Sequence, residues 1–155
     1  MNKPKKHEIL LWNIALPGFG QILNKKFIKG ITFVFMEFIV NVQSNFNLAI
    51  KHSFTNNIEQ AYDVINYQWL MFYPCLYMFA IWDGYRDAED AKLGPYSYLP
   101  FVFGAFALTI GLMYSNTVMI RIGPVFFPML CLIPGVFVGW VIKRIFIHVE
   151  KSPDQ

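Results

Sequence analysis

The stretch LPGFGQILNKK, residues 16–26, decides the topology of this chain. It places a proline and two glycines inside the first apolar segment, residues 9–23, and these residue types favour a turn over a continuous helix. A straight helix over the segment would reach roughly 22 Å, short of the roughly 30 Å hydrocarbon core of a bilayer. The chain either crosses a membrane here as a distorted helix or turns back.

The composition favours a membrane protein. Of the 155 residues, 55% are hydrophobic and only 15% are charged, whereas about 25% of a soluble domain is charged. Aromatic residues reach 18%, and large rings suit both lipid and its interface with water. The length predicts a single integral membrane domain over residues 1–155.

Positive charges indicate that the first segment turns back. Lysines lie on both sides of it, three before (Lys3, Lys5, Lys6) and three after (Lys25, Lys26, Lys29). A crossing would place one of these groups outside, against the positive-inside rule. We therefore predict a re-entrant or interfacial helix over 9–23 that turns at residues 17–20. Non-helical backbone at membrane depth needs protein cover, so this turn is expected to pack against later helices.

Further apolar segments predict four transmembrane helices. Their expected ranges are 27–49, 67–82, 99–120 and 125–142, with a short interfacial helix around 58–64 in the first long loop. This arrangement places all but two of the 13 Lys and Arg residues on one side, the exceptions being Lys51 and Arg121. The predicted fold class is all-α: a polytopic membrane protein of four spans plus the N-terminal re-entrant helix.

Small residues predict close helix packing in the last two spans. They recur at four-residue spacing in both segments: Ala107, Gly111 and Ser115, with Gly104 on the same face, and then Gly135 and Gly139. Small side chains let backbones approach closely in lipid. A tight turn at residues 121–124 favours an antiparallel hairpin, and a dimer face is the alternative.

Glu37 is the most unusual residue of the predicted spans. It follows Lys29 by eight residues, roughly 12 Å along a helix, where an ionised carboxylate is costly. Asn41 and Asn45 continue a polar stripe on the same face. The stripe predicts either an ion or proton site or a set of internal hydrogen bonds, and we expect the second.

Sequence patterns for catalysis or metal binding are not found. The three histidines lie in the two tails and in a loop, and they form no ligand spacing. We expect no enzyme activity, no cofactor and no metal. The acidic residues of 83–90 are expected to form a solvated face, and Asp83 is expected to contact a lysine of 25–29 or the amides of the Pro-Gly turn.

Two motifs carry a family resemblance. The stretch PGFGQILNKKFIKG resembles the pattern Pro-Gly-x-Gly-Gln-x-Tyr-Asn-Gly-x-x-x-Lys-Gly of small bacterial membrane proteins related to the TM2-domain family, and DGYRDA resembles the Asp-Ala-Tyr-Arg-x-Ala segment that ends their next helix. The matching residues are Pro17, Gly18, Gly20, Gln21, Asn24, Lys29, Gly30, Asp83, Tyr85, Arg86 and Ala88. The chain departs from the pattern at three positions, with Leu23 for tyrosine, Lys25 for glycine and Gly84 for alanine, and its first long loop is also longer.

The resemblance covers roughly residues 9–90 and implies a fold and a location. It implies a multi-pass protein of the bacterial cytoplasmic membrane, and the charge pattern predicts that both termini are cytoplasmic. The expected function is that of a non-enzymatic scaffold or accessory subunit, with the lipid bilayer and other membrane proteins or further copies of itself as partners, and no nucleic acid. A small transporter or channel component that uses Glu37, Asn41 and Asn45 is the alternative.

Overall fold

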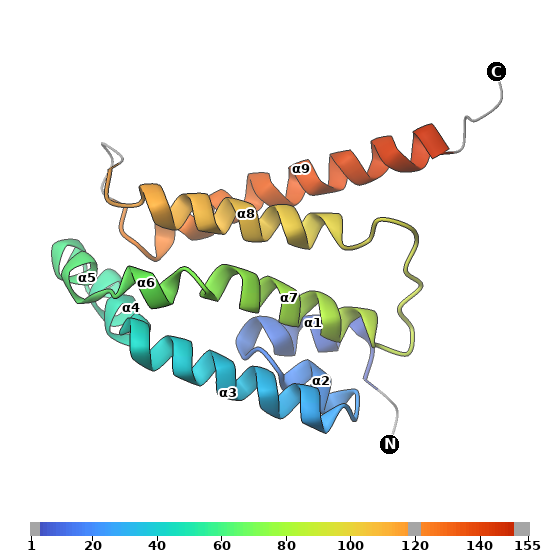
Figure 1. Ribbon diagram of the computed structural model, residues 1–155, viewed down its shortest axis with the longest axis horizontal. Helices are drawn as coiled ribbons and strands as arrows, with labels where there is room; N and C mark the ends of the chain where they lie inside the picture. The colour runs from blue at the N-terminus through green and yellow to red at the C-terminus, as the bar shows by residue number, and fades with distance from the viewer. Residues whose placement is uncertain (1–3, 118–121, 151–155) are drawn as a thin grey trace.

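A computed structural model describes residues 4–117 and 122–150, and all regular secondary structure in this part of the chain is helical (Figure 1). The helices are α1 Lys6–Ala15, α2 Phe19–Leu23, α3 Phe27–Ser44, α4 Phe46–Phe54, α5 Ile58–Val64, α6 Tyr67–Leu70, α7 Tyr73–Arg86, α8 Leu99–Tyr114 and α9 Phe126–Glu150. The all-α class expected from the sequence is confirmed for these residues.

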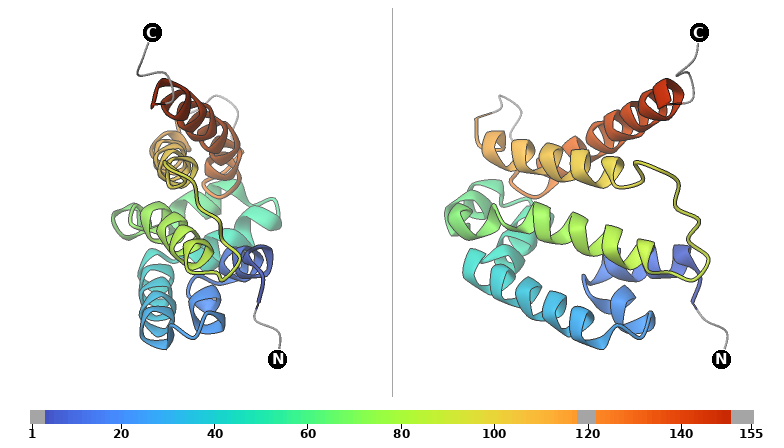
Figure 2. Two further views of the ribbon diagram at one scale, coloured as in Figure 1. Left: turned by 90° about the vertical axis from the view of Figure 1, so that its right-hand side faces the viewer. Right: turned by 45° about the vertical axis from the view of Figure 1, so that its right-hand side comes forward.

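Four long helices alternate in direction. Helices α3 and α8 run one way and α7 and α9 the other, so that α1 begins and α9 ends at the same end of the molecule (Figures 1 and 2). We call α1, α2 and the turn between them the N-terminal hook. The hook lies at this end, the hook end, together with the start of α3 and the end of α7. Helices α4 and α5 lie at the opposite, far end.

The hook reverses the chain, as the glycines predict. Helix α1 ends at Ala15, and Gly18 adopts a left-handed conformation with φ of +105° before α2 begins. Gly18 has no room for a side chain, because a Cβ there would lie 2.5 Å from the Gly30 carbonyl oxygen and 2.8 Å from Val34. The turn therefore packs directly on α3, and α1 packs along α7.

The expected span 27–49 is not one helix. Asn45 adopts a left-handed conformation with φ of +56°, which ends α3 at Ser44 and starts α4 in a new direction. The Asn45 side-chain amide donates to the Val64 carbonyl oxygen at 3.0 Å and thereby ties the break to α5. Helix α5, Ile58–Val64, lies where the sequence predicted a short helix.

The other three expected spans also have different bounds. The segment 67–82 is divided into α6 and α7, because Pro74 lies in the first turn of α7 and favours a helix start there. Helix α7 then continues to Arg86. Helix α8 ends at Tyr114, while the expected end at 118–120 and the turn residue Arg121 lie outside the described residues. Helix α9 continues past 142 to Glu150, with Pro134 inside it.

Within the part of the chain that the structure describes, two helices are long and apolar enough to cross a membrane, α3 and α9. A buried core helix would meet the same criterion, so two such helices indicate membrane association only weakly. In this structure, however, only 22% and 11% of the residues in their apolar windows are buried. The four spans expected from the sequence are not confirmed, since α7 and α8 are shorter than the bilayer core requires.

Candidate functional site

The hook end contains a cluster of polar side chains that joins the hook to α7. We call it the polar cluster and define it as Asn13, Gln21, Asn24, Lys29, Asp83, Arg86 and Asp87. Asn13 and Gln21 are fully buried, and Asp83 is 3% exposed. Buried amide and carboxylate groups are stable only when hydrogen-bonded, so the partners of these groups decide what the cluster does.

Asn13 closes the turn of the hook. Its side-chain oxygen accepts from the backbone amides of Gly18 at 3.2 Å and Gly20 at 2.9 Å, and its side-chain nitrogen donates to the Ala80 carbonyl oxygen at 3.2 Å. The first residues of α2 thus receive their cap from the preceding helix. We expected Asp83 either to contact a lysine or to cap these amides, and Asn13 makes the second of these contacts.

Glycines make room for Asn13. A Cβ placed on Gly20 or on Gly84 would overlap the Asn13 side-chain amide. An alanine at position 84 would therefore displace the Asn13 side chain. Because Gly84 of α7 has no side chain, Asn13 of α1 can pack directly against α7 at that position.

Gln21 links the turn to the acidic end of α7. Its side-chain nitrogen donates to the Ala80 carbonyl oxygen at 2.7 Å and to Asp83 at 3.3 Å. Its side-chain oxygen is buried and has no hydrogen-bond partner among the described residues. Gln21 and Asn13 therefore converge on one backbone carbonyl from two sides, which fixes the hook at one height along α7.

Asp83 is the charged centre of the cluster. One of its oxygens accepts from the Lys29 ammonium at 2.9 Å and from the Arg86 guanidinium at 2.8 Å. Lys29 also pairs with Asp87 at 2.9 Å, and Arg86 lies over the Trp82 ring at 4.4 Å from its centroid. Two cations and two carboxylates thus balance within the cluster, and the start of α3 is tied to the end of α7.

Asp87 is the outer carboxylate of this pairing, with a side chain that is 17% exposed. Partial burial acts to raise its pKa, but the hydrogen bond and charge of Lys29, together with those of Arg86, hold the pKa below its usual value. The carboxylate form is therefore favoured by folding.

Two further contacts complete the attachment of the hook. The Asn24 side-chain amide donates to the Gly84 carbonyl oxygen at 2.8 Å. The Tyr77 hydroxyl donates to the carbonyl oxygen of Ile14, at the end of α1, at 2.8 Å. Sequence reasoning singled out Gln21, Asn24, Asp83 and Arg86 but gave no role to Asn13. A lone asparagine within an apolar segment was the signal that could have identified it.

The polar stripe of α3 lies apart from the polar cluster. Asn41 follows Glu37 by four residues on the same helix, so the two side chains share one face of α3. The Asn41 side-chain oxygen is buried without a partner among the described residues, and Asn45 bonds to the α5 backbone instead. None of the three cavities described for this structure includes a residue of the stripe in its lining.

The small residues expected in the last two spans lie between α8 and α9, which form a C-terminal hairpin. A Cβ on Gly139 would lie 2.5 Å from the Leu99 carbonyl oxygen, and one on Gly111 would lie 2.6 Å from the Pro128 Cα. A Cβ on Gly135 would overlap that of Ala107. The intramolecular packing that we favoured over a dimer face accounts for these positions.

Two members of that set have additional neighbours. A Cβ on Gly104 would lie 2.7 Å from Met78 of α7 and near two residues of α9, so Gly104 lies where the hairpin meets the rest of the molecule. Ser115, just after α8, is buried and bonds to tyrosines of the far end, Tyr62 and Tyr67. Ser115 thus connects α8 with α5 and α6.

No family, no curated protein and no solved structure matches this chain. The resemblance to proteins related to the TM2-domain family therefore stays a prediction from the two motifs. Within the described residues, no group of three or more His, Cys, Asp and Glu side chains is placed to hold a metal ion.

Proposed function

We propose that this chain is a non-enzymatic, multi-pass membrane protein that acts as a scaffold or accessory subunit of a membrane assembly. The observation that carries the proposal is the uncovered surface of α9. Among the described residues, α8 is the one helix with which α9 shares an extensive interface. The remaining surface of α9 exposes large apolar side chains at Met129, Leu130, Ile133, Phe137, Val138, Trp140, Ile145, Phe146 and Val149.

The roles of the polar side chains also support a scaffold. The polar cluster binds the hook to α7 through internal bonds, so its chemistry serves the shape of the hook end. An enzyme site instead needs groups that converge on a space for a substrate.

The direction of the helices (Figure 1) and the charge pattern support a membrane placement. With the hook end toward the cytoplasm, α3, α6–α7, α8 and α9 make four crossings, and the hook enters and leaves on the cytoplasmic side. Helices α6 and α7 together extend over residues 67–86, which reach roughly 30 Å if helical throughout. The two motifs support a location in the bacterial cytoplasmic membrane, and partners would be other membrane proteins or further copies of this chain.

Site-specific photo-crosslinking in cells tests the scaffold. A photoreactive residue at Ile133 or Phe137, on the exposed face of α9, is expected to give discrete protein adducts. The same residue at Phe35 or Phe38, which are as exposed on α3, is the matched control and is expected to give lipid adducts alone. If the α9 positions also gave lipid adducts alone, as the α3 positions are expected to do, the proposal would be overturned.

A transporter or channel component is the second candidate, and Glu37 is the observation that favours it. A carboxyl group within a predicted span, on the same helix face as Asn41, is unusual because polar groups at that depth are costly. Glu37→Gln retains the shape and removes the charge. Proteoliposome flux that depends on Glu37 would establish this candidate, whereas unchanged expression and adducts from α9 in the variant would support the scaffold.

A further inference from the structure

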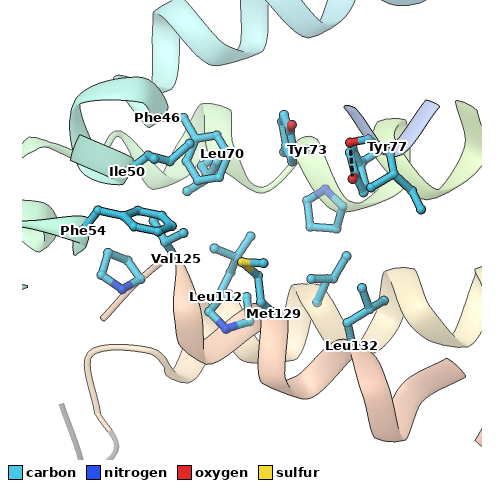
Figure 3. A pocket seen from close by; sticks show the side chains of 15 residues that line it. Phe46, Ile50, Phe54, Leu70, Tyr73, Tyr77, Leu112, Val125, Met129 and Leu132 are labelled. Atoms are coloured by element: carbon cyan, nitrogen blue, oxygen red, sulfur yellow. Dashed lines mark hydrogen bonds between the residues drawn. The ribbon is translucent and has the colours of Figure 1, made fainter. Parts of the chain in front are cut away.

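A cavity of about 280 Å³ lies beyond the tip of the hook. Its walls come from α4, α7, α8 and α9, and Figure 3 shows Phe46, Ile50 and Phe54 on one side facing Leu112, Met129 and Leu132 on the other. Ile14, at the end of α1, also lines it. The cavity therefore begins where the hook ends.

The short length of α1 explains why the cavity exists. Ten helical residues reach about 15 Å, roughly half of a bilayer core, so α1 covers α7 over only part of its length. Beyond Ile14, the helices α4 and α9 are not in extensive contact, and the Phe54 and Phe126 rings, 5.0 Å apart, join them near the far end. The end of α1 at Ala15 therefore leaves this space open.

The lining selects a hydrocarbon. Aliphatic and aromatic side chains and three prolines form almost all of it. Tyr77, one of the two hydroxyl groups at the hook side, already donates to the Ile14 carbonyl oxygen, as the dashed line in Figure 3 shows. A volume near 280 Å³ is close to the lower limit of about 300 Å³ for ligand pockets, and apolar cavities of this kind hold apolar guests rather than water.

The opening of the cavity faces the surroundings of the helices. Phe54 and Met129 line the cavity and are also 71% and 56% exposed, so the space opens at the surface between α4 and α9. In a membrane this surface meets lipid chains directly. The opening lies on the far-end side of the hook tip, which is the outer leaflet in the orientation proposed above.

Charge near the opening suits a phosphate. Lys51 and His52 form the basic last turn of α4, directly after the lining residue Ile50 and before Phe54. Lys51 is exposed and pairs with no carboxylate among the described residues. It is one of only two cations that the charge pattern places at the outer side. A lysine in the helical turn between the lining residues Ile50 and Phe54 is complementary to an anionic phospholipid.

We propose that this cavity binds one acyl chain of an outer-leaflet phospholipid whose phosphate lies at Lys51. The inference rests on the proposed membrane placement. The acyl chain fills the space that α1 leaves open beyond Ile14. It contacts α4 on one side and the C-terminal hairpin on the other.

The test uses the full chain in nanodiscs of phosphatidylglycerol with a photoactivatable group on the acyl chain. Crosslinks are expected to concentrate at Ile50, Met129 and Leu132, relative to the exposed Phe35 of α3. Met129→Trp should reduce the cavity crosslinks roughly tenfold, which corresponds to about 1.4 kcal/mol of binding free energy. Met113→Trp is the matched control, because Met113 is also 56% exposed but lies outside the cavity lining, and it should leave them unchanged.

The headgroup is tested with Lys51→Gln. This variant should lower the preference of the cavity for phosphatidylglycerol over an uncharged diacylglycerol carrying the same labelled chain. Cavity crosslinks no denser than those at Phe35, or equally dense in Met129→Trp, would overturn acyl-chain binding, and an unaltered headgroup preference would overturn the phosphate contact. Failure of the membrane placement is seen separately, as release of the protein from membranes by alkaline carbonate.

Discussion

The hook end and the C-terminal hairpin hold helices together by opposite means. At the hook end, amides, carboxylates and cations of four helices form directed bonds around Ala80 and Asp83. In the hairpin, α8 and α9 approach so closely that Gly139 lies against the backbone of Leu99. The directed bonds of the hook end fix its position along α7, whereas the close approach of α8 and α9 maximises their contact area. Dispersion favours such close packing wherever lipid offers no hydrophobic driving force.

The difference teaches where each region tolerates change. Directed bonds fail when a donor or acceptor is removed, and close backbone packing fails when a side chain is added. Substitutions that remove polar atoms should therefore act mainly at the hook end, and substitutions that add volume should act most strongly in the hairpin. The variants below, with stability measured in detergent micelles, test this division from the largest expected effect to the smallest.

Gly139→Leu should cause the largest loss. The new side chain would meet the Leu99 carbonyl oxygen and the Pro100 Cα, which are backbone atoms that cannot move aside cheaply. We expect a loss of about 3 kcal/mol in the free energy of unfolding. Gly94→Leu is the control, because nothing lies within 4 Å of a Cβ at that position. Equal stability of the two variants would contradict the packing of the hairpin.

Asp83→Ala should be next in size. It leaves Lys29, Arg86 and Gln21 without their shared acceptor, and Asp83 itself is almost fully buried. Because both cations are partly exposed, we expect about 2 kcal/mol, less than the 3–5 kcal/mol typical of a fully buried pair. Asp87→Ala, at the more exposed carboxylate, should lose less. A larger loss of stability in Asp87→Ala than in Asp83→Ala would show that Asp87 is the charged centre of the cluster.

Sequence reasoning anticipated the reversal of the chain because proline, glycine and flanking lysines carry local information. It also anticipated the Lys29–Asp83 pair as one of several choices. It could not supply Asn13, since the role of that residue depends on Gly84, 71 positions later in the chain. The break before Pro74 was missed because apolar composition continues through it. The break at Asn45 was missed because the polar residues around it do not by themselves end a helix, and only the contact of Asn45 with α5 fixes it.

A double-mutant cycle tests the match of Asn13 to Gly84. Gly84→Ala alone should destabilise by about 2 kcal/mol, because its Cβ overlaps the Asn13 amide. In the Asn13→Ala background the space is open, so the same change should be nearly neutral. A coupling of about 1 kcal/mol or more is expected. Simple additivity of the two changes would show that they do not share this space.

The pH dependence of stability separates the two regions further. Folding lowers the pKa of Asp87, so its pairing contributes fully above the unfolded pKa of about 3.9 and is lost as the pH falls through the folded value. The stability difference between the wild type and Asp87→Asn should be constant from about pH 7 to 5 and shrink below about pH 4. A difference that stays constant down to pH 2 would argue against a lowered pKa.

Lys25→Gly should have the smallest effect, and it should stabilise. Lys25 adopts a left-handed conformation with φ of +61° in the turn between α2 and α3, at the position where the resembling pattern has glycine. Relief of this strain, offset by the greater freedom of glycine in the unfolded chain, leaves a gain below about 1 kcal/mol. Lys26→Gly, with φ of −95°, is the control and should not stabilise.

The carbonyl of Ala80 has a consequence for how this protein is made. Asn13 and Gln21 both depend on it, yet it leaves the ribosome 67 and 59 residues after them. Until then the side-chain amides of Asn13 and Gln21 have no acceptor at that site. The hook can therefore attach to α7 only after α7 has been made, although it is the first part to be synthesised.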